Sequence, residues 1–341
     1  MENNSIFLSI CITSYKRVNE LKRCLYSIDS AKKDKIEVIV SEDCSSEREQ
    51  IRNVVDEYAK TSPFKVVFNT NEQNLGYDRN LKKLATLATG EYVFYMSDDD
   101  CLFSGKLDNF IEMLEDKHPA MAYTSFLYGY NEKRVERRKY ENSHEIPSKV
   151  TYDGKRIYDA ILFTGLTFKR EYLLDIDGER FKNMNYIQVY MFLHVLYHHG
   201  GYYDRILLID NVSDGENAYG QVESSGKGNA LLANRESVFS NLEFNKGLFK
   251  VIRMFDEDNC TDMFEQFRKE FSLRSLGGLY RARNFGLKTY NDYWKRLKDS
   301  GIKLTTIATI YYFIVLVLGA KLSKKLFVAL RFLLAKFRKQ Y

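Results

Sequence analysis

Three adjacent carboxylates, Asp98, Asp99 and Asp100, directly follow the apolar run Tyr92–Met96. An apolar run of this length, rich in β-prone residues, predicts a buried strand, so the triplet is expected at a strand end. Neighbouring carboxylates repel one another, and a divalent cation is the commonest reason for a strand end to hold three of them. Oxygen ligands alone favour Mg²⁺ or Mn²⁺ over zinc. A solvated acidic turn is the alternative explanation.

The first hundred residues contain the elements that must position this triplet. Apolar runs predict four strands, at 6–12, 36–40, 64–68 and 92–96. Between them, apolar residues spaced i, i+3, i+4, i+7 predict three helices, whose stripes are Leu21, Cys24, Leu25 and Ile28; Ile51, Val54, Val55 and Tyr58; and Leu81, Leu84, Ala85 and Ala88. This alternation predicts a parallel sheet with right-handed crossovers.

Ligands of such a sheet bind at the carboxyl ends of its strands. The loops expected to meet there are 13–17, 42–46, 69–79 and 97–100. All four are rich in polar or charged residues. A nucleotide diphosphate bound among them would need a cation for its phosphates and at least one positive side chain.

The second half of the chain is less regular. Residues 121–130 predict a strand, and 191–197 a helix. His194 and His198 lie one helical turn apart and could chelate a metal, but the glycines that follow His199 favour a helix C-terminus instead. Residues 211–229 are rich in Gly, Ser and Asn and suggest a loop that could act as a lid, and 231–300 have helical spacing without recognisable chemistry.

Charge and cysteine content limit the function classes. The net charge of +5 comes from residues 301–341, which hold eight basic side chains and no acids, so the body of the protein is mildly acidic. This argues against nucleic acid as a partner. The basic block 133–139 is a local exception, which we expect to be a solvated hairpin or loop. The five cysteines form no CxxC pair and suggest reduced thiols in the cytoplasm.

The C-terminal tail combines an apolar run with a basic amphipathic pattern. Residues 304–320 are nearly uncharged and have about the shortest length that could span a bilayer. Beyond them, six apolar residues share one helical face and basic residues take the other; the apolar ones are Leu322, Leu326, Leu330, Leu333, Leu334 and Phe337. Residues 301–341 therefore predict attachment to an anionic membrane surface. The alternative is a packed pair of C-terminal helices, which could form the dimer interface of a homo-oligomer.

Four segments together resemble the inverting family 2 glycosyltransferases with the GT-A fold. Residues 9–17 resemble that family's opening strand and nucleotide loop, and 37–46 its second strand and acidic turn, with Glu42 and Cys44 in place of the usual Asp and Gly. Residues 74–92 are similar to its third segment. Ser97 and the three aspartates stand where the family carries its metal-binding DxD-type motif. The resemblance covers residues 6–103.

The resemblance implies a fold and a set of site residues. The fold is a Rossmann-like α/β domain whose mixed, mainly parallel sheet is flanked by helices, with a helical C-terminal extension. Thr13, Tyr15 and Asp43 would contact the base and ribose of a nucleotide-sugar donor, with Arg17 in the same loop as Tyr15. Arg79 would lie near the base or diphosphate and Asp98 on the ribose and phosphate side. Asp99 would hold Mn²⁺ or Mg²⁺, with Asp100 as a supporting ligand.

The catalytic base is where this chain departs from the family. Members usually carry an acidic residue at the start of a helix in the second half, but residues 181–191 contain no carboxylate and Gln188 stands near that position. Asp177 and Glu179, just upstream, are the candidate bases, although acids in such a segment are more often surface residues. Asp214 and Glu216 lie in the later loop.

These observations predict a metal-dependent glycosyltransferase at the cytoplasmic membrane face, with a glycan or lipid-linked acceptor in surface polysaccharide synthesis. The expected division is 1–103 for the nucleotide-sugar half, 104–230 for the acceptor half, 231–300 for a helical extension and 301–341 for the membrane tail. An inactive membrane-attached scaffold with the same fold is one alternative. A sugar-phosphate nucleotidyltransferase is another, although loop 13–17 lacks the glycines expected of its phosphate loop.

Overall fold

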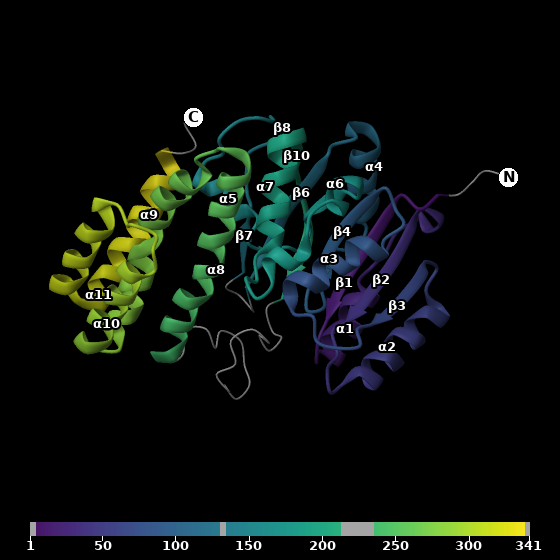
Figure 1. The fold of residues 1–341 in the computed structure, drawn as a ribbon, viewed down its shortest axis with the longest axis horizontal. Coiled ribbons are helices and arrows are strands. Elements are labelled where there is room, and N and C mark those ends of the chain that lie inside the picture. Colours follow the sequence, from purple (N-terminus) through teal and green to yellow (C-terminus); the bar gives the residue numbers. More distant parts are fainter. Residues whose placement is uncertain (1–4, 130–133, 213–234, 338–341) are drawn as a thin grey trace. The chain divides into compact units, whose positions relative to one another are not determined.

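The computed structural model describes residues 5–129, 134–212 and 235–337, which fall into two compact units (Figure 1). The first, here called the sheet unit, comprises residues 1–151 and 159–219. The second, the helical unit, comprises residues 152–158 and 220–341. The predicted loop at 211–229 lies almost entirely outside the described residues.

The first half of the sheet unit alternates strands and helices. Its elements are β1 (Leu8–Ser14), α1 (Val18–Tyr26), the short η1 (Lys33–Lys35), β2 (Ile36–Glu42), α2 (Arg48–Thr61), β3 (Lys65–Thr70), α3 (Tyr77–Leu87) and β4 (Tyr92–Ser97). β1 is parallel to β2 on one side and to β4 on the other, and β3 is parallel to β2. The four predicted strands and three predicted helices are therefore confirmed, and the carboxyl ends of the strands share one edge.

The second half extends the same sheet. Its elements are β5 (Cys101–Leu102), α4 (Leu107–Lys117), β6 (Met121–Tyr128), β7 (Val135–Arg137), β8 (His144–Ile146), β9 (Thr167–Lys169), α6 (Glu171–Leu174), η3 (Gly178–Phe181), α7 (Ile187–His199) and β10 (Gly201–Asn211). The strand order is β3-β2-β1-β4-β9-β6-β10-β5. β9 runs antiparallel to β4 and β6, whereas β6 and β10 are parallel. The sheet is mixed, with its long strands parallel, as expected from the sequence.

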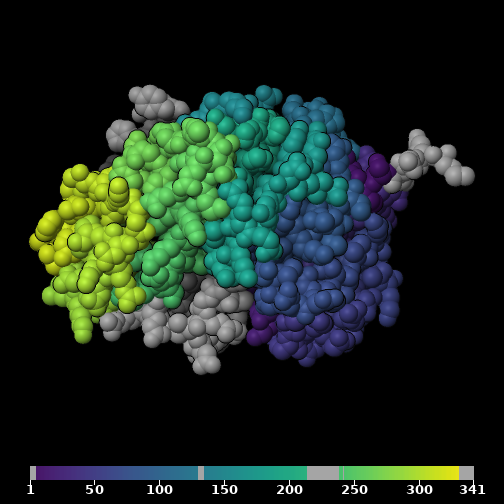
Figure 2. All heavy atoms as spheres, viewed as in Figure 1, coloured from purple at the N-terminus to yellow at the C-terminus, as the bar shows by residue number. Residues whose placement is uncertain are grey.

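Apolar residues on both faces of the central strands explain why these segments form a sandwiched sheet. Leu8, Ile10 and Ile12 of β1 are completely buried, as are the intervening Ser9 and Cys11. Helices cover both faces of such a sheet, so its strands are continuous apolar runs. Figure 2 shows all heavy atoms of the same view as spheres, with the first half of the sheet unit in purple and blue. Gly90 precedes β4 where a Cβ would lie 2.9 Å from the backbone nitrogen of Ser9, too close for any other residue.

Glu37 links neighbouring strands at the end of the sheet that lies opposite the aspartate triplet. Its carboxylate accepts hydrogen bonds from Ser9 Oγ at 2.7 Å, from Thr89 N at 2.7 Å and from Lys65 Nζ at 2.7 Å. Burial alone would raise the pKa of Glu37, but these donors outweigh it and lower the pKa. One buried carboxylate thus joins β1, β2, β3 and the turn before β4.

Helix α7 ends as the two histidines and following glycines predicted. Its last residue is His199, and Gly200 follows with a positive φ of 74°, which glycine adopts without strain. The ring of His199 stacks on Tyr172, with 3.8 Å between centroids. His198 Nδ1 lies 2.9 Å from Lys149 Nζ. These contacts explain the histidines as packing residues at a helix end.

The helical unit contains α5 (Gly154–Asp159, except its last residue), α8 (Arg235–Asn259), α9 (Met263–Asn284), α10 (Leu287–Asp299) and α11 (Thr306–Phe337). The predicted helical character of residues 231–300 is confirmed over its described part. α9 packs against α8, α10 and α11. α11 is bent at Gly319, whose φ of 69° and ψ of −179° interrupt the helical backbone.

Replacing Glu37 with Gln should make the protein less stable at neutral pH and less sensitive to acid. A carboxylate with a lowered pKa stabilises the fold above its unfolded pKa of about 4.3 and loses this effect as the pH falls through its folded pKa. We expect Glu37→Gln to reduce the free energy of unfolding by about 1–3 kcal/mol at pH 7, and by less at pH 3. Denaturant unfolding at several pH values measures this, with the exposed Glu49→Gln as control. Equal losses at both pH values would contradict the assignment.

Candidate nucleotide and metal site

The aspartate triplet lies where β4 ends, beside the loop that follows β1. Thr13 of β1 is in register with Ser97 of β4 and with Ser41 of β2. The backbone N–H of Tyr15 donates to Asp98 Oδ2 at 3.2 Å. Parallel pairing therefore brings loops 13–17 and 97–100 into direct contact, as the topology predicted.

Arg17 joins two of the three carboxylates. Its Nη1 lies 2.9 Å from Asp98 Oδ1 and 3.1 Å from Asp99 Oδ2. Burial disfavours the charged guanidinium, but the two carboxylates outweigh this and raise the pKa of Arg17. The Asp98 and Asp99 carboxylates thus converge on a single positive charge, which is the arrangement that a cation site requires.

The three aspartates differ in burial. The side chain of Asp98 is 4 % exposed and that of Asp99 is 15 % exposed, whereas Asp100 is fully buried. Burial raises the pKa of Asp98 to about 7, against the opposing effect of Arg17. It also raises the pKa of Asp100, and the neighbouring Asp99 adds to that shift. Asp99 is therefore the carboxylate of the three that a ligand from solvent reaches most easily.

Asp100 is fixed by neutral donors. Its Oδ1 accepts a 2.6 Å hydrogen bond from Asn211 Nδ2, at the end of β10, and its Oδ2 accepts one from Thr164 Oγ1. Thr164 Oγ1 in turn accepts from the backbone N–H of Ser97 at 3.1 Å. In this conformation both Asp100 oxygens accept hydrogen bonds, so one oxygen would have to keep its hydrogen bond and also bind the metal if Asp100 were a ligand.

Arg138 holds the segment that carries Thr164. It lies in the basic block expected to be solvated, and for this residue the expectation is wrong: Arg138 is only 6 % exposed. Its guanidinium donates to the carbonyl oxygens of Asp159, at 2.7 Å, Thr164, at 3.1 Å, and Leu162. Burial lowers the pKa of Arg138 to about 10. Backbone carbonyl oxygens of an irregular segment therefore accept the hydrogen bonds that the Arg138 guanidinium was expected to donate to water.

Asp43 organises the loops after β2 and β3. Its carboxylate accepts hydrogen bonds from the backbone N–H groups of Leu75, at 2.8 Å, and Gly76, at 2.9 Å, and from Asn71 Nδ2, at 2.9 Å. Burial raises its pKa. Asn71 also donates to Asn80 Oδ1 at 3.0 Å. Asp43 thus shapes the nucleotide-side loops in addition to the ligand contact expected of it.

Arg79 lies beside one of the candidate bases. Its Nε donates to Leu75 O at 2.7 Å, and its Nη1 lies 3.6 Å from Glu179 Oε2. The Glu179 side chain is 69 % exposed. Asp177 is also exposed, and its Oδ1 accepts from the backbone N–H of Glu179 at 2.9 Å, which caps η3. Both candidate bases therefore belong to a group around Arg79 and not to the aspartate triplet.

Asp78 is a buried acid that the sequence analysis did not single out. Its carboxylate accepts four backbone N–H groups in a row, from Met184 at 3.0 Å, Asn185 at 2.7 Å, Tyr186 at 2.9 Å and Ile187 at 2.9 Å. These groups open α7, and burial raises the pKa of Asp78. The first turn of α7 contains no acidic residue, and the Asp78 carboxylate of α3 caps it instead.

Gln188 follows this cap and is 2 % exposed. Its Nε2 donates to Ile161 O at 3.0 Å, in the segment that Arg138 holds, while its Oε1 has no hydrogen-bond partner among the described residues. An amide cannot act as a general base. Sequence analysis could not identify four of these residues, because their partners lie far away along the chain; they are Thr164, Asn211, Arg138 and Asp78. The single local signal was that Asp78 is an acid in the first turn of α3.

The site residues fit a divalent cation with few protein ligands. The described residues contain no group of three or more His, Cys, Asp or Glu side chains that could hold a metal ion. Asp98 and Asp99 supply two converging carboxylates, and Mg²⁺ commonly binds through one or two carboxylates together with phosphate oxygens and water. The donor set is thus suited to a cation that arrives with a diphosphate.

Residues 9–173 match the family model for glycosyl transferase family 2. An uncharacterized glycosyltransferase of Haemophilus influenzae is 31% identical over 120 residues, which are 33% of this chain and 38% of that protein. The abequosyltransferase RfbV of Salmonella typhimurium is 30% identical over 104 residues, 30% of this chain and 31% of that protein. The matches thus span less than two fifths of the length of these curated relatives.

Two solved structures share the fold. S. aureus TarS 1–349 superposes with a TM-score of 0.52 at 14% identity, covering 90% of this chain and 91% of that one. The mannosyltransferase PcManGT from Pyrobaculum calidifontis, in complex with GDP-Man and Mn²⁺, superposes with a TM-score of 0.51 at 14% identity, covering 97% of this chain and 86% of that one.

Removing the Asp78 carboxylate should destabilise the sheet unit. Asp78→Ala leaves four backbone N–H groups at the start of α7 without their acceptor, and we expect a loss of about 2–4 kcal/mol in the free energy of unfolding. Chemical denaturation measures it. Asp56→Ala, the same change at an exposed position of α2, should stay within about 0.5 kcal/mol of the parent. Similar stabilities for both variants would show that the cap contributes little.

Proposed function

We propose that this chain, whose residues 9–173 match the family model for glycosyl transferase family 2, transfers a sugar from a nucleotide-sugar donor to an acceptor hydroxyl with the help of Mn²⁺ or Mg²⁺. The observation that carries the proposal is the convergence of Arg17, Asp98 and Asp99 at the carboxyl end of parallel strands. The loops that Asp43 holds adjoin the same sheet edge. Structures with this fold include TarS with UDP and PcManGT with GDP-Man and Mn²⁺, which supports a nucleotide-sugar donor.

Each group has a defined task in this proposal. Thr13 and Tyr15 contact the base and ribose, together with Asp43, and Asp98 fixes the loop that carries Tyr15. Asp99 is the main ligand of the cation, which when bound neutralises charge on the departing nucleoside diphosphate. Arg17 balances the two carboxylates before the cation arrives and can turn towards the diphosphate afterwards. Arg79 lies at the diphosphate side, between the nucleotide loop and Glu179.

The acceptor hydroxyl needs a base on the opposite side of the sugar. Glu179 is better suited than Asp177, because an oxygen of Asp177 already accepts the backbone hydrogen bond that caps η3. The alternative is a scaffold that binds the nucleotide sugar without turnover. The lack of an acid in residues 181–191 and the use of Asp78 as a helix cap favour it.

The proposal includes attachment to a membrane through residues 301–341, which would suit a lipid-linked or surface-polysaccharide acceptor at the cytoplasmic face. Residues 306–329 form a helix that is long and apolar enough to cross a membrane by length and composition, with 22% of its 18-residue apolar window buried. All five cysteines are free thiols, which fits a reducing compartment.

Asp99→Asn should reduce nucleoside diphosphate release by about 100-fold or more, because the cation loses its most accessible ligand. The experiment supplies the full chain with a panel of nucleotide sugars and Mn²⁺ or Mg²⁺, and measures diphosphate release and sugar transfer. Asp116→Asn, at an exposed position of α4, is the matched control and should behave as the parent. Undiminished transfer by Asp99→Asn would refute the metal role, and binding without release from any donor would favour the scaffold.

Glu179→Gln should lower the turnover number by about 100-fold while leaving the donor KM nearly unchanged, because a base acts on the acceptor and not on the nucleotide. Asp177→Asn, two residues away, should have a much smaller effect. Steady-state kinetics with a saturating acceptor separates the two parameters. If both variants retain full turnover, the base lies elsewhere.

A further inference from the structure

The helical unit exposes a row of large apolar side chains on α11. Ile310, Phe313 and Val317 are 47 %, 57 % and 81 % exposed. Residues three and seven positions apart lie on one face of a helix, so the three form a single stripe. Exposed apolar surface of this kind marks contact with a partner or a membrane.

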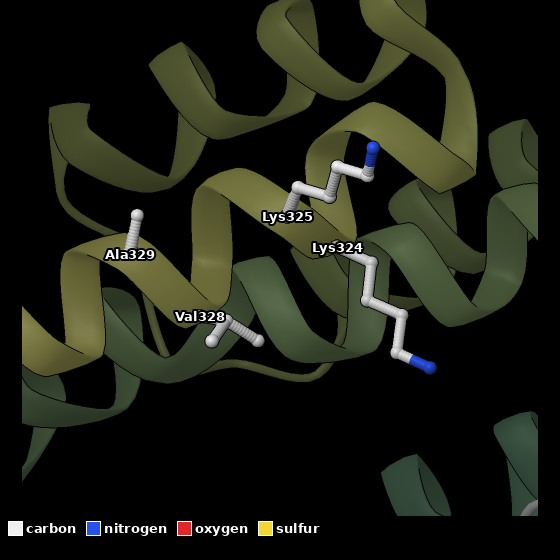
Figure 3. A pocket seen from close by; sticks show the side chains of 4 residues that line it. All are labelled: Lys324, Lys325, Val328 and Ala329. Atoms are coloured by element: carbon white, nitrogen blue, oxygen red, sulfur yellow. The ribbon is translucent and has the colours of Figure 1, made fainter.

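The part of α11 beyond Gly319 is basic on its exposed surface. Lys321, Lys324 and Lys325 are all exposed, interspersed with Leu322, 54 % exposed, and Val328, 60 % exposed. Figure 3 shows Lys324 and Lys325 extending from the helix beside a shallow pocket that Val328 and Ala329 also line. The sequence from residue 301 to the end contains no acid. This surface is complementary to an anionic partner.

The other face of α11 packs against the rest of the helical unit. Ala308, Tyr311 and Val315 are buried, and α11 packs along α9. The ring of Tyr312 stacks on Trp294 of α10, with 4.7 Å between centroids. Beyond the bend, the ring of Phe327 contacts Tyr280 of α9, with centroids 5.6 Å apart. Both segments of α11 therefore pack against α9, and the first also contacts α10.

These neighbours cannot enter the hydrocarbon core of a bilayer. α9 carries many charged side chains, including Glu265, Arg268, Lys269, Arg274 and Arg281. Charged groups at the bilayer centre are costly, and a non-helical residue there leaves backbone groups unsatisfied. A membrane-spanning α11 would have to leave α9 and straighten at Gly319.

We propose that α11 is a bent amphipathic helix that lies in the plane of an anionic membrane surface and does not cross it. Ile310, Phe313 and Val317 insert at the level of the upper acyl chains, and the lysines beyond the bend pair with anionic lipid headgroups. This inference rests on the proposed membrane attachment and defines its geometry. α9 and α10 remain on the aqueous side.

Vesicle flotation of the full chain tests the electrostatic part. The protein should float with vesicles of phosphatidylcholine and phosphatidylglycerol, and much less with phosphatidylcholine alone. Replacing Lys321, Lys324 and Lys325 together by Gln should weaken binding by about 100-fold, since each lysine near an anionic surface contributes roughly a fivefold factor. The matched control, with the exposed sheet-unit residues Lys33, Lys60 and Lys83 changed to Gln, should bind as the parent does.

A second variant tests the apolar stripe. Phe313→Ser with Val317→Ser changes exposed side chains and should abolish flotation while leaving thermal unfolding unchanged, whereas Val135→Ser with Val150→Ser in the sheet unit should leave flotation intact. Alkaline carbonate should release the bound parent protein from membranes, because a helix on the surface is extracted and a spanning helix is not.

Four results would overturn the inference. Three of them are equal binding to neutral and anionic vesicles, full binding by the lysine variant, and retention on the membrane after carbonate. The fourth is that the parent protein forms dimers and binds no lipid, while the Phe313/Val317 variant is monomeric. The last result would identify a second copy of the chain as the occupant of the stripe. Diphosphate release from soluble donors, measured without vesicles, tests the proposed transfer separately, because the α11 variants leave the site residues unchanged.

Discussion

Holding three consecutive carboxylates, two of them buried, at the end of a strand is the constraint on which the sheet unit depends. The three carboxylates have two kinds of partner: Asp98 and Asp99 share the Arg17 guanidinium, whereas Asp100 accepts hydrogen bonds from Thr164 and Asn211. Arg17 comes from the loop after β1, and the other two donors come from distant parts of the chain. The carboxylates therefore hold together the loops that a nucleotide would contact, and their burial keeps Asp98 and Asp100 easier to protonate than free aspartates.

In the helical unit, the constraint is that the strongly apolar helix α11 packs against helices that are exposed to water. One face of α11 is buried against α9, while Phe313 and Val317 remain exposed on another. The bend at Gly319 lets both segments follow α9 and separates the apolar stripe from the lysines.

The amino-acid sequence alone was sufficient for the architecture of the first hundred residues. Apolar runs and helical stripes there are local patterns, so they identified four strands and three helices, and the alternation required a parallel sheet whose loops meet at one edge. The same reasoning located the aspartate triplet, the loop that contains Tyr15 and Arg17, and the end of α7 at His199. The place of residues 152–158 in the helical unit and the antiparallel β9 have no such local signal.

The tertiary structure alone decided which polar side chains are buried and what they bind. Arg138 belongs to a basic block typical of solvated loops, yet the carbonyls of the 159–164 segment surround it. Asp78 looks like an ordinary acid in the first turn of a helix, yet it caps α7 more than a hundred residues away. Hydrogen bonds of this kind depend on where the chain returns in space, and composition and periodicity carry no information about that. Local patterns thus determined the sheet and its reactive edge, whereas long-range packing determined how that edge is held.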